Sequence, residues 1–328
     1  MCADRSFMGL PDGIRSRLRL PVIAAPMFRV SGPALVGAAC AAGVIGAFPA
    51  ANARTIDELD AWLTQLDRAA AAAARAPYAV NLIIRQKRLA DDLACLERHR
   101  VEVVITSVGS PESVLDRLHA AGALVLADVA SLRHARRAVA AGADGLVLLT
   151  AGAGGQTGWV NPFAFVRAVR GFFDGPVVLA GGISDGRTLR AAEMLGCDLA
   201  YMGTRFIATH ESMASEEYKR MLVDCSLDDI VLTRAFTGLP TSMLAPAIRA
   251  AGLEPDHLDE RATPENATQL YGGHGPGLTP PQWVDTWSAG HSVSGVEAVE
   301  SVASLVHRLS KEFREAGGVV GPRPAPTA

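Results

Sequence analysis

The sequence predicts an α/β fold, a (β/α)8 or TIM barrel with a small helical lid inserted after the eighth strand. Short apolar runs alternate with segments of helical period along most of the chain. Apolar runs of this length are typical of parallel strands buried on both faces. Eight alternating units favour a closed barrel over an open sheet. The predicted strands are Pro21–Phe28, Val44–Pro49, Tyr78–Ile84, Val101–Val108, Leu124–Val129, Leu146–Leu149, Val177–Ala180 and Leu199–Met202.

Residues that commonly start helices follow several of these runs. Ser31 is predicted to cap the helix after the first strand, because a serine side chain can accept a hydrogen bond from an unpaired N–H of the first turn. Thr55 and Glu58 have the spacing of a capping box. Ser131 and Ser184 are expected to begin the helices after strands five and seven.

The pattern changes after the eighth strand. We expect the barrel over residues 1–210 and a lid or substrate-binding segment over residues 211–292, which are rich in Gly and Pro. Apolar residues at helical spacing predict a C-terminal helix over residues 293–316 that packs on the barrel. Residues 317–328 are expected to be a disordered tail.

Composition excludes several classes of function. The chain has 328 residues, is 49% apolar and carries a net charge of −3 with acids and bases interspersed. This balance argues against nucleic acid or an anionic membrane as the main partner. The five cysteines are scattered without a CxxC pair, and no apolar stretch approaches 18 residues. We therefore expect a cytoplasmic protein with reduced thiols and no membrane span.

Glycines at the ends of the last two strands predict a phosphate site. Gly181 and Gly182 follow the seventh strand, and Gly203 and Thr204 follow the eighth. Barrels of this type usually hold a phosphate at these two strand ends, where glycine lets backbone N–H groups approach the anion. Close packing at the barrel corners is the alternative explanation.

Two other strand ends have residues that suit a ligand. Ala25, Pro26 and Met27 end the first strand with a flat, extended backbone against which a planar ring could lie, although a plain buried strand end is an equal alternative. Asn81 lies inside the apolar third strand, and a buried amide needs hydrogen-bond partners. Those partners could be a cofactor or a neighbouring backbone.

The sixth strand leads into a glycine-rich loop, Ala151–Gly158. Its polar side chain best placed for chemistry is Gln156, which can hydrogen-bond but cannot act as a base near neutral pH. The histidines show no spacing typical of metal ligands, so no metal is predicted. His274 and His291 lie in the glycine-rich lid and could reach the barrel mouth.

From Pro21 to Leu309, the sequence resembles the nitronate monooxygenase (2-nitropropane dioxygenase) family of FMN-dependent TIM barrels. The resemblance is carried by PVIAAPM, VNLI, ITSVGSP, RHARRAVAAGADGL, AGAGGQTG, LAGGI, YMGTRFIAT and SAGHSVSG. It implies an FMN cofactor, a small-molecule nitronate substrate and O2. The cofactor residues expected on this basis are Ala25, Pro26, Met27, Asn81, Gly181, Gly182, Gly203 and Thr204. Asp128, Gly154 and Gly155 are also expected to bind the cofactor.

The chain departs from the family pattern at three positions. Family members commonly read EAGGHxG where this chain reads GAGGQTG, so Gly152 replaces a glutamate and Gln156 replaces the catalytic histidine. His291 stands where relatives often carry glutamine. Gln156 and His291 are the candidate catalytic residues. Without the family's base, the enzyme is expected to oxidise nitronates but to be weak on neutral nitroalkanes.

Other functions stay open. The same flavin could serve an NAD(P)H-dependent reductase of a quinone or an enoyl thioester, or the barrel could bind flavin without catalysis. An isomerase or aldolase without flavin would need a catalytic Lys or paired carboxylates, and Asp128 at the end of strand five is the nearest candidate. We interpret Asp128 instead as a hydrogen-bond acceptor near the flavin or in the shell of residues that supports it. The oligomeric state is open, with a homodimer as one option.

Overall fold

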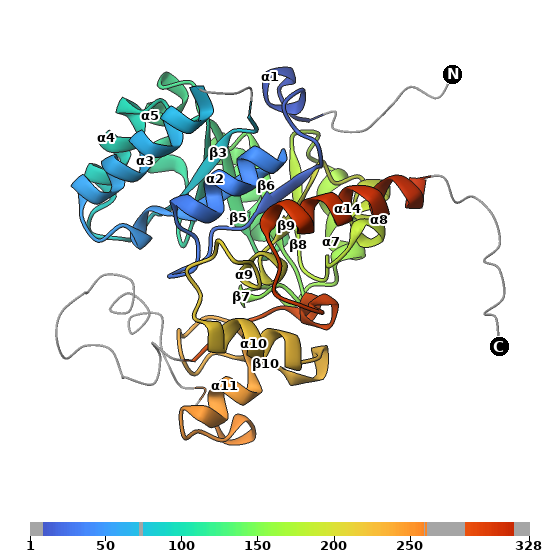
Figure 1. Cartoon of the computed structure of the whole chain (residues 1–328). Coiled ribbons are helices and arrows are strands. Elements are labelled where there is room, and N and C mark those ends of the chain that lie inside the picture. Colours follow the sequence, from blue (N-terminus) through green and yellow to red (C-terminus); the bar gives the residue numbers. More distant parts are fainter. Residues whose placement is uncertain (1–8, 72–74, 259, 261–285, 318–328) are drawn as a thin grey trace.

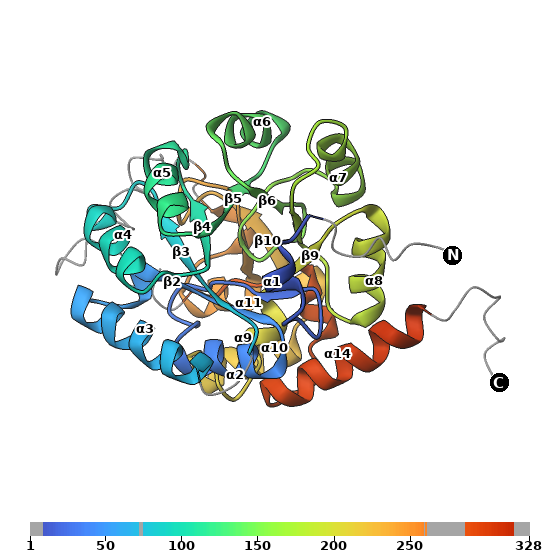
Figure 2. The same cartoon turned by 90° about the horizontal axis from the view of Figure 1, so that it is seen from above.

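The computed structural model describes residues 9–71, 75–258, 260 and 286–317. Its central element is a closed barrel of eight parallel strands in chain order, which confirms the predicted fold (Figure 2). Each barrel strand is four to six residues long except the first, which has three. The barrel strands are β1 (Val22–Ala24), β2 (Ile45–Pro49), β3 (Tyr78–Ile83), β4 (Val103–Ser107), β5 (Leu124–Val129), β6 (Gly145–Leu149), β8 (Val177–Ala180) and β9 (Leu199–Met202).

Helices form a ring around the barrel (Figure 2). The ring consists of α2 (Pro33–Ala42), α3 (Ile56–Ala71), α4 (Leu89–Arg98), α5 (Glu112–Ala120), α6 (Leu132–Ala141), α7 (Pro162–Arg170), α8 (Gly186–Leu195) and α14 (Val302–Gly317). Helix α14 packs between α8 and α2 and so fills the last position of the ring. The predicted C-terminal helix therefore begins later than residue 293, because His291–Gly295 forms a separate 3-10 turn, η4.

The helix starts agree with the sequence at some positions and differ at others. Ser131 caps α6 by accepting a hydrogen bond from His134 N–H. The predictions for Ser31 and Ser184 are wrong: Gly32 is the N-cap of α2, and Asp185 caps α8 in a capping box. Asp185 is adjacent to Ser184, and both residue types are favourable caps, so sequence alone does not separate them.

The inside of the barrel is packed by alternate residues of each strand. Leu124 and Leu126 of β5 point inward, as do Leu199 and Tyr201 of β9. Because side chains of a strand alternate between faces, Asp128 has the same inward parity as Leu126. The carboxyl ends of the strands thus place a few polar side chains above an apolar core.

The segment after β9 lies at the end of the barrel opposite to α1 (Asp12–Arg15), as Figure 1 shows for α10, α11 and β10. It contains α9 (Thr204–Ile207), α10 (Glu216–Asp224), β10 (Ile230–Thr233), β11 (Thr241–Leu244) and α11 (Ala245–Ala250). The predicted small helical lid also contains strands, since β10 and β11 form a three-stranded sheet with β7 (Gly155–Gln156) from the glycine-rich loop. Much of the Gly- and Pro-rich stretch, His274 included, lies outside the described residues, as does nearly all of the expected tail.

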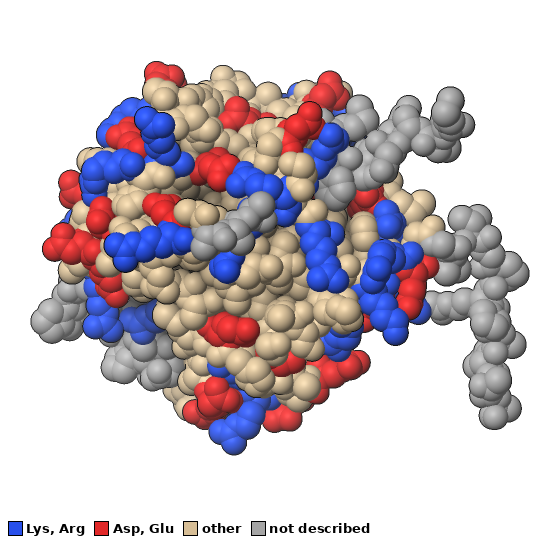
Figure 3. Space-filling model, turned by 45° about the horizontal axis from the view of Figure 1, so that its top comes forward, with Lys and Arg blue, Asp and Glu red and all other residues tan. Residues whose placement is uncertain are grey.

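The surface carries charges of both signs. On the face that Figure 3 shows, Lys and Arg side chains are interspersed with Asp and Glu. Within the described part of the chain, no helix combines the length and the hydrophobicity that crossing a bilayer requires.

Candidate functional site

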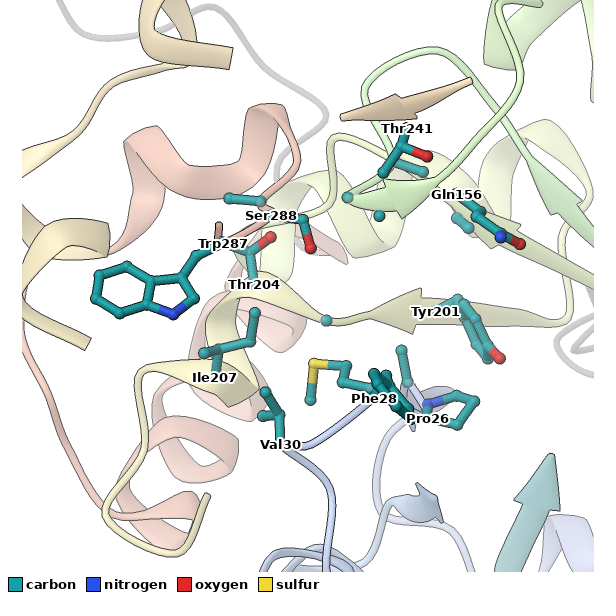
Figure 4. Close-up of a pocket in the computed structure, with 18 of the residues that line it drawn as sticks. Pro26, Phe28, Val30, Gln156, Tyr201, Thr204, Ile207, Thr241, Trp287 and Ser288 are labelled. Atoms are coloured by element: carbon teal, nitrogen blue, oxygen red, sulfur yellow. The ribbon is translucent and has the colours of Figure 1, made fainter. Parts of the chain in front are cut away.

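A pocket of about 610 Å³ opens at the carboxyl ends of the barrel strands. Its walls come from the strand ends, the glycine-rich loop and the segment that follows β9; Figure 4 shows side chains of all three. This volume lies in the range typical of cofactor and small-molecule sites. The pocket brings together all the residues predicted to bind the cofactor, namely Ala25, Pro26, Met27, Asn81, Asp128, Gly154, Gly155, Gly181, Gly182, Gly203 and Thr204.

The ends of β8 and β9 form an open corner of this pocket. Gly181 and Gly182 have φ angles of +122° and +72°, which favour glycine, and no atom lies within 4 Å of the position that a Cβ of Gly182 would occupy. The Thr204 hydroxyl accepts a hydrogen bond from Gly290 N–H at 3.0 Å, so its own proton can still be donated. An anion such as a phosphate would fit these features.

Two residues that sequence reasoning did not assign to the site hold the end of β1. Ser31 is fully buried; its hydroxyl donates to Ala25 O and accepts from Met27 N–H. The Asn52 side chain donates to Met27 O at 2.9 Å. These bonds fix the extended backbone that was predicted to lie against a planar ring. For Ser31, the available signal in the sequence is a polar residue after an apolar strand, but the same residue also fits a helix cap.

Asn81 lines the pocket but its amide is also part of the barrel wall. Its Nδ2 donates to Ile105 O at 3.2 Å, and its Oδ1 accepts from Ser107 Oγ at 3.3 Å. The sequence left two kinds of partner open, a cofactor or a neighbouring backbone. In the structure, the Asn81 side chain bonds to residues of the neighbouring strand β4. Asn81 lines the pocket and retains further hydrogen-bonding capacity.

Gln156 is positioned by a sheet rather than by a free loop. It pairs with Thr241 of β11, and Thr157 N–H donates to Pro240 O at 3.0 Å. Gln156 and Thr241 both line the pocket, and Figure 4 shows them beside each other. This pairing connects the loop to the segment after β9.

His291 is not brought into the pocket. It is exposed, its N–H donates to Gly152 O at 2.9 Å, and its ring lies against Gly152. A Cβ at Gly152 would be 2.7 Å from Nδ1 of His291. Two of the departures from the family pattern therefore share one space: the imidazole of His291 occupies the position where a side chain at residue 152 would begin.

Two buried polar atoms lie at the floor of the pocket. The Oδ1 atom of Asp128 and the hydroxyl of Tyr201 have no hydrogen-bond partner in the described part of the chain. Burial raises the pKa of Asp128 from 3.8 to about 7. Burial and the nearby Asp128 carboxylate raise the pKa of Tyr201 well above its usual value. Sequence reasoning missed Tyr201, because a tyrosine in an apolar strand resembles an ordinary core residue.

The opposite wall is aromatic. The Tyr218 ring stacks on Trp287 with centroids 5.0 Å apart and an angle of 10°, and the Tyr218 hydroxyl donates to Ser288 O. Burial raises the pKa of Tyr218. In Figure 4, Trp287 lies at one end of the drawn residues and Gln156 and Tyr201 lie at the other.

One group of potential metal ligands occurs among the described residues. Asp60, Cys95 and His99 place one ligand atom each within 4.8 Å of one another, on the outer helices α3 and α4 and their flank. Asp60 is already paired with Arg98 at 2.9 Å, and His99 contacts both Asp60 and Asp67. These contacts satisfy the cluster without an ion.

Comparison with known proteins identifies the family. The sequence model described as nitronate monooxygenase matches residues 93–309. This chain belongs to the nitronate monooxygenase family. The resemblance seen in the sequence motifs is thus confirmed.

Individual relatives differ in their named activities. A Mycobacterium tuberculosis protein named (3aS,4S,5R,7aS)-5-hydroxy-7a-methyl-1-oxo-octahydro-1H-indene-4-carboxyl-CoA dehydrogenase is 33% identical over 227 residues, covering 68% of this chain and 62% of the relative. A nitronate monooxygenase of Paraburkholderia phytofirmans is 31% identical over 291 residues, covering 76% and 78%. The match with the Mycobacterium tuberculosis protein thus spans less than two thirds of that protein's length.

Solved structures share the fold over nearly the whole chain. FabK from Thermotoga maritima superposes with a TM-score of 0.78 at 28% identity, covering 93% of this chain and 96% of its own. The nitroalkane oxidase from Streptomyces ansochromogenes gives a TM-score of 0.74 at 28% identity, covering 93% and 99%. Both are similar to this chain in fold and, at this identity, in sequence.

Proposed function

We propose that the chain is an FMN-dependent oxidoreductase that oxidises alkyl nitronates with O2. The observation that carries the proposal is Gln156, which lines the pocket at the position of the family's catalytic histidine. Among the described residues that line the pocket, none is a histidine, cysteine or lysine. The pocket suits a substrate that needs no imidazole base.

FMN is proposed because the family resemblance implies it and because the pocket has one open glycine corner that suits a single phosphate. Gly181, Gly182, Gly203 and Thr204 would hold the phosphate, and the backbone of Ala25–Met27 would lie along the ring. When bound, the flavin supplies the capacity to accept two electrons from the substrate and pass them to O2.

The substrate preference follows from proton chemistry. A nitronate is already the deprotonated anion, whereas a neutral nitroalkane must first lose a proton from carbon. The amide of Gln156 can donate hydrogen bonds to nitronate oxygens but cannot take up that proton. Since general-base catalysis typically contributes about 10²–10⁴-fold, turnover of neutral nitroalkanes should be weak.

A reductase or dehydrogenase of thioesters is the second candidate. It is favoured by the relative named as a carboxyl-CoA dehydrogenase, which is 33% identical to this chain. The aromatic wall of Tyr218 and Trp287 also offers more apolar surface than a small nitronate needs. We propose that the segment over residues 211–292 forms the substrate-facing side in either case.

Anaerobic reduction of the bound flavin distinguishes these candidates. The purified protein should show the absorbance of oxidised flavin, which ethyl nitronate should bleach and NADPH should not. Bleaching by NADPH alone would assign the chain to the reductases. A flavin that neither donor bleaches would favour a flavin-binding protein without catalysis, and the absence of flavin after reconstitution would overturn the proposal.

Gln156→His tests the role of the missing base. This variant should raise kcat/KM for neutral nitroethane by about 10²-fold or more while changing that for ethyl nitronate little. Gln156→Ala is the matched control, since it removes the amide without adding a base. Equal rates of the wild-type protein on nitroethane and ethyl nitronate would contradict the reasoning.

A further inference from the structure

The floor of the pocket contains two polar groups that the barrel itself does not satisfy. Less than 1 Å² of Asp128 Oδ1 and of the Tyr201 hydroxyl is accessible, and neither has a hydrogen-bond partner in the described part of the chain. Both residues line the pocket. Leaving a buried polar atom without a partner costs roughly 1–3 kcal/mol, so such atoms at a pocket floor indicate a bound molecule that completes them.

The two groups come from different parts of the barrel. Asp128 ends β5 and Tyr201 lies in β9, with β6 and β8 between them in the sheet. The carboxylate of Asp128 contributes to raising the pKa of Tyr201, so the two groups lie within electrostatic range. No hydrogen bond joins them among those found in the described residues. Asp128 and Tyr201 therefore line one pocket, and each has a polar atom that a bound molecule could complete.

The Tyr201 hydroxyl is a hydrogen-bond donor near neutral pH, and the Asp128 carboxyl is a donor when it carries a proton. Burial holds the Asp128 pKa at about 7, and the Tyr201 pKa lies well above its usual value. A carboxyl group that burial keeps neutral can donate to an oxyanion, and a tyrosine can act with it. The pair thus has the chemistry to hold an oxygen that carries negative charge.

Gln156 and Thr204 also line the pocket and can donate hydrogen bonds, but neither has a carboxyl group that burial can keep neutral. Ser107 donates to Asn81 Oδ1, and the Asn81 side chain donates to Ile105 O of the barrel backbone. Arg29 and Glu217 line the pocket but are exposed. Tyr218 donates its proton to Ser288 O. Among the described residues that line the pocket, Asp128 is the carboxyl group with a buried oxygen. Its charge state can therefore depend on what binds beside it.

We propose that Asp128 and Tyr201 form a neutral donor pair for an anionic oxygen of the bound molecule, and that anion binding in this pocket is accompanied by a proton on Asp128. The oxygen belongs either to the substrate, as in a nitronate or an enolate, or to the ring of the reduced flavin. The inference deepens the proposed function. It rests on the proposed function where the oxygen belongs to the flavin ring.

The test compares wild-type protein with Asp128→Asn, Tyr201→Phe and Asp116→Asn. Asn keeps the shape of Asp128 and a donor but cannot titrate. Asp116 is exposed on α5, so its replacement controls for the loss of one carboxylate. Circular dichroism and the flavin content of each variant show whether it is folded and loaded.

The first arm measures binding of propionate, an unreactive anion of the size of ethyl nitronate, by calorimetry from pH 5.5 to 9. If the anion is the source, the wild-type dissociation constant should rise about tenfold per pH unit above pH 7, because binding then requires uptake of one proton. Asp128→Asn should bind without this dependence, and Tyr201→Phe should bind about 5–10-fold more weakly at every pH.

The second arm measures the midpoint potential of the bound flavin over the same pH range. If the oxygen belongs to the reduced ring, the wild-type potential should change its pH slope near pH 7, and Asp128→Asn should remove that change. Asp116→Asn should resemble the wild-type protein in both arms. Either arm with an inflection that depends on Asp128 supports the inference and identifies the source.

The inference is overturned if Asp128→Asn and the wild-type protein give the same pH profiles in both arms. A chain that binds no flavin would instead refute the proposed function; the propionate arm would then decide the inference by itself, since calorimetry needs no chromophore.

Discussion

Replacing Gly182 with alanine should weaken FMN binding without a comparable loss of fold. Gly182 has a φ of +72°, and a Cβ built on it has no neighbour within 4 Å, because it would point into the open corner between β8 and β9. The methyl group therefore collides with no protein atom of the described structure. It occupies the space that a phosphate needs in order to reach the backbone N–H groups.

The magnitude has two separate parts. A positive φ costs an alanine roughly 1–2 kcal/mol of folding stability relative to glycine. Displacing the phosphate from a backbone N–H should remove about 1.5–3 kcal/mol of binding, the usual contribution of a hydrogen bond to a charged group. The FMN dissociation constant should consequently rise by about 10- to 100-fold.

Gly122→Ala provides a matched control. Gly122 has a φ of +86° and likewise no neighbour within 4 Å of its Cβ position, but it lies in the turn between α5 and β5, at the opposite end of the barrel. Both variants should lose similar stability in urea unfolding, and only Gly182→Ala should bind FMN weakly in a fluorescence titration. Unchanged FMN affinity in Gly182→Ala, or an equal loss in Gly122→Ala, would refute the phosphate site.

Three further predictions concern stability. A rise in the Asp128 pKa from 3.8 to about 7 means that the folded flavin-free protein binds more protons than the unfolded chain, so its free energy of unfolding should fall as pH rises from about 4 to 7. Asp128→Asn should remove up to about 4 kcal/mol of this decline in urea unfolding; an unchanged pH profile would contradict it. Gly152→Ala should cost about 2 kcal/mol, because residue 152 has a φ of +87° and its Cβ would lie 2.7 Å from the His291 ring. Adding His291→Ala should recover the part due to the contact, and strictly additive losses would argue against it. Asp198→Ala should cost about 3–5 kcal/mol, since it removes the carboxylate that pairs with the half-buried Arg170; a loss below about 1 kcal/mol would show that the backbone acceptors of Arg170 compensate for it.

The barrel could be predicted because each of its strands is buried on both faces. A run such as Val177–Ala180 lacks the alternation of polar and apolar residues that an exposed strand shows. The helical segments between such runs recur at regular intervals. The glycine corner was also predictable, since Gly181 and Gly182 follow a recognised strand. The sequence signals of buried strands and of the glycines that follow them depend only on residues nearby in the chain.

The small sheet and the floor of the pocket depend on distant partners. β7 has only two residues, Gly155 and Gln156, and becomes a strand because β11 pairs with it. Tyr201 shares its inward parity with Leu199, but its environment is set by Asp128 from another strand. Ser31 has a favourable capping residue type, yet its hydroxyl bonds to the end of β1 instead. Local patterns do not contain these contacts.

After β9, the chain leaves the barrel and returns to it at the same place. This arrangement explains how the segment that lines the pocket can vary in length. Ala208 O accepts a hydrogen bond from Glu300 N–H, and Glu300 O accepts one from His210 N–H, so the excursion between them leaves and re-enters the barrel at one place. Because its two ends are already held together, lengthening it costs only the slow logarithmic rise of loop entropy. The segment between these two points can therefore change during evolution while α14 still closes the ring of helices.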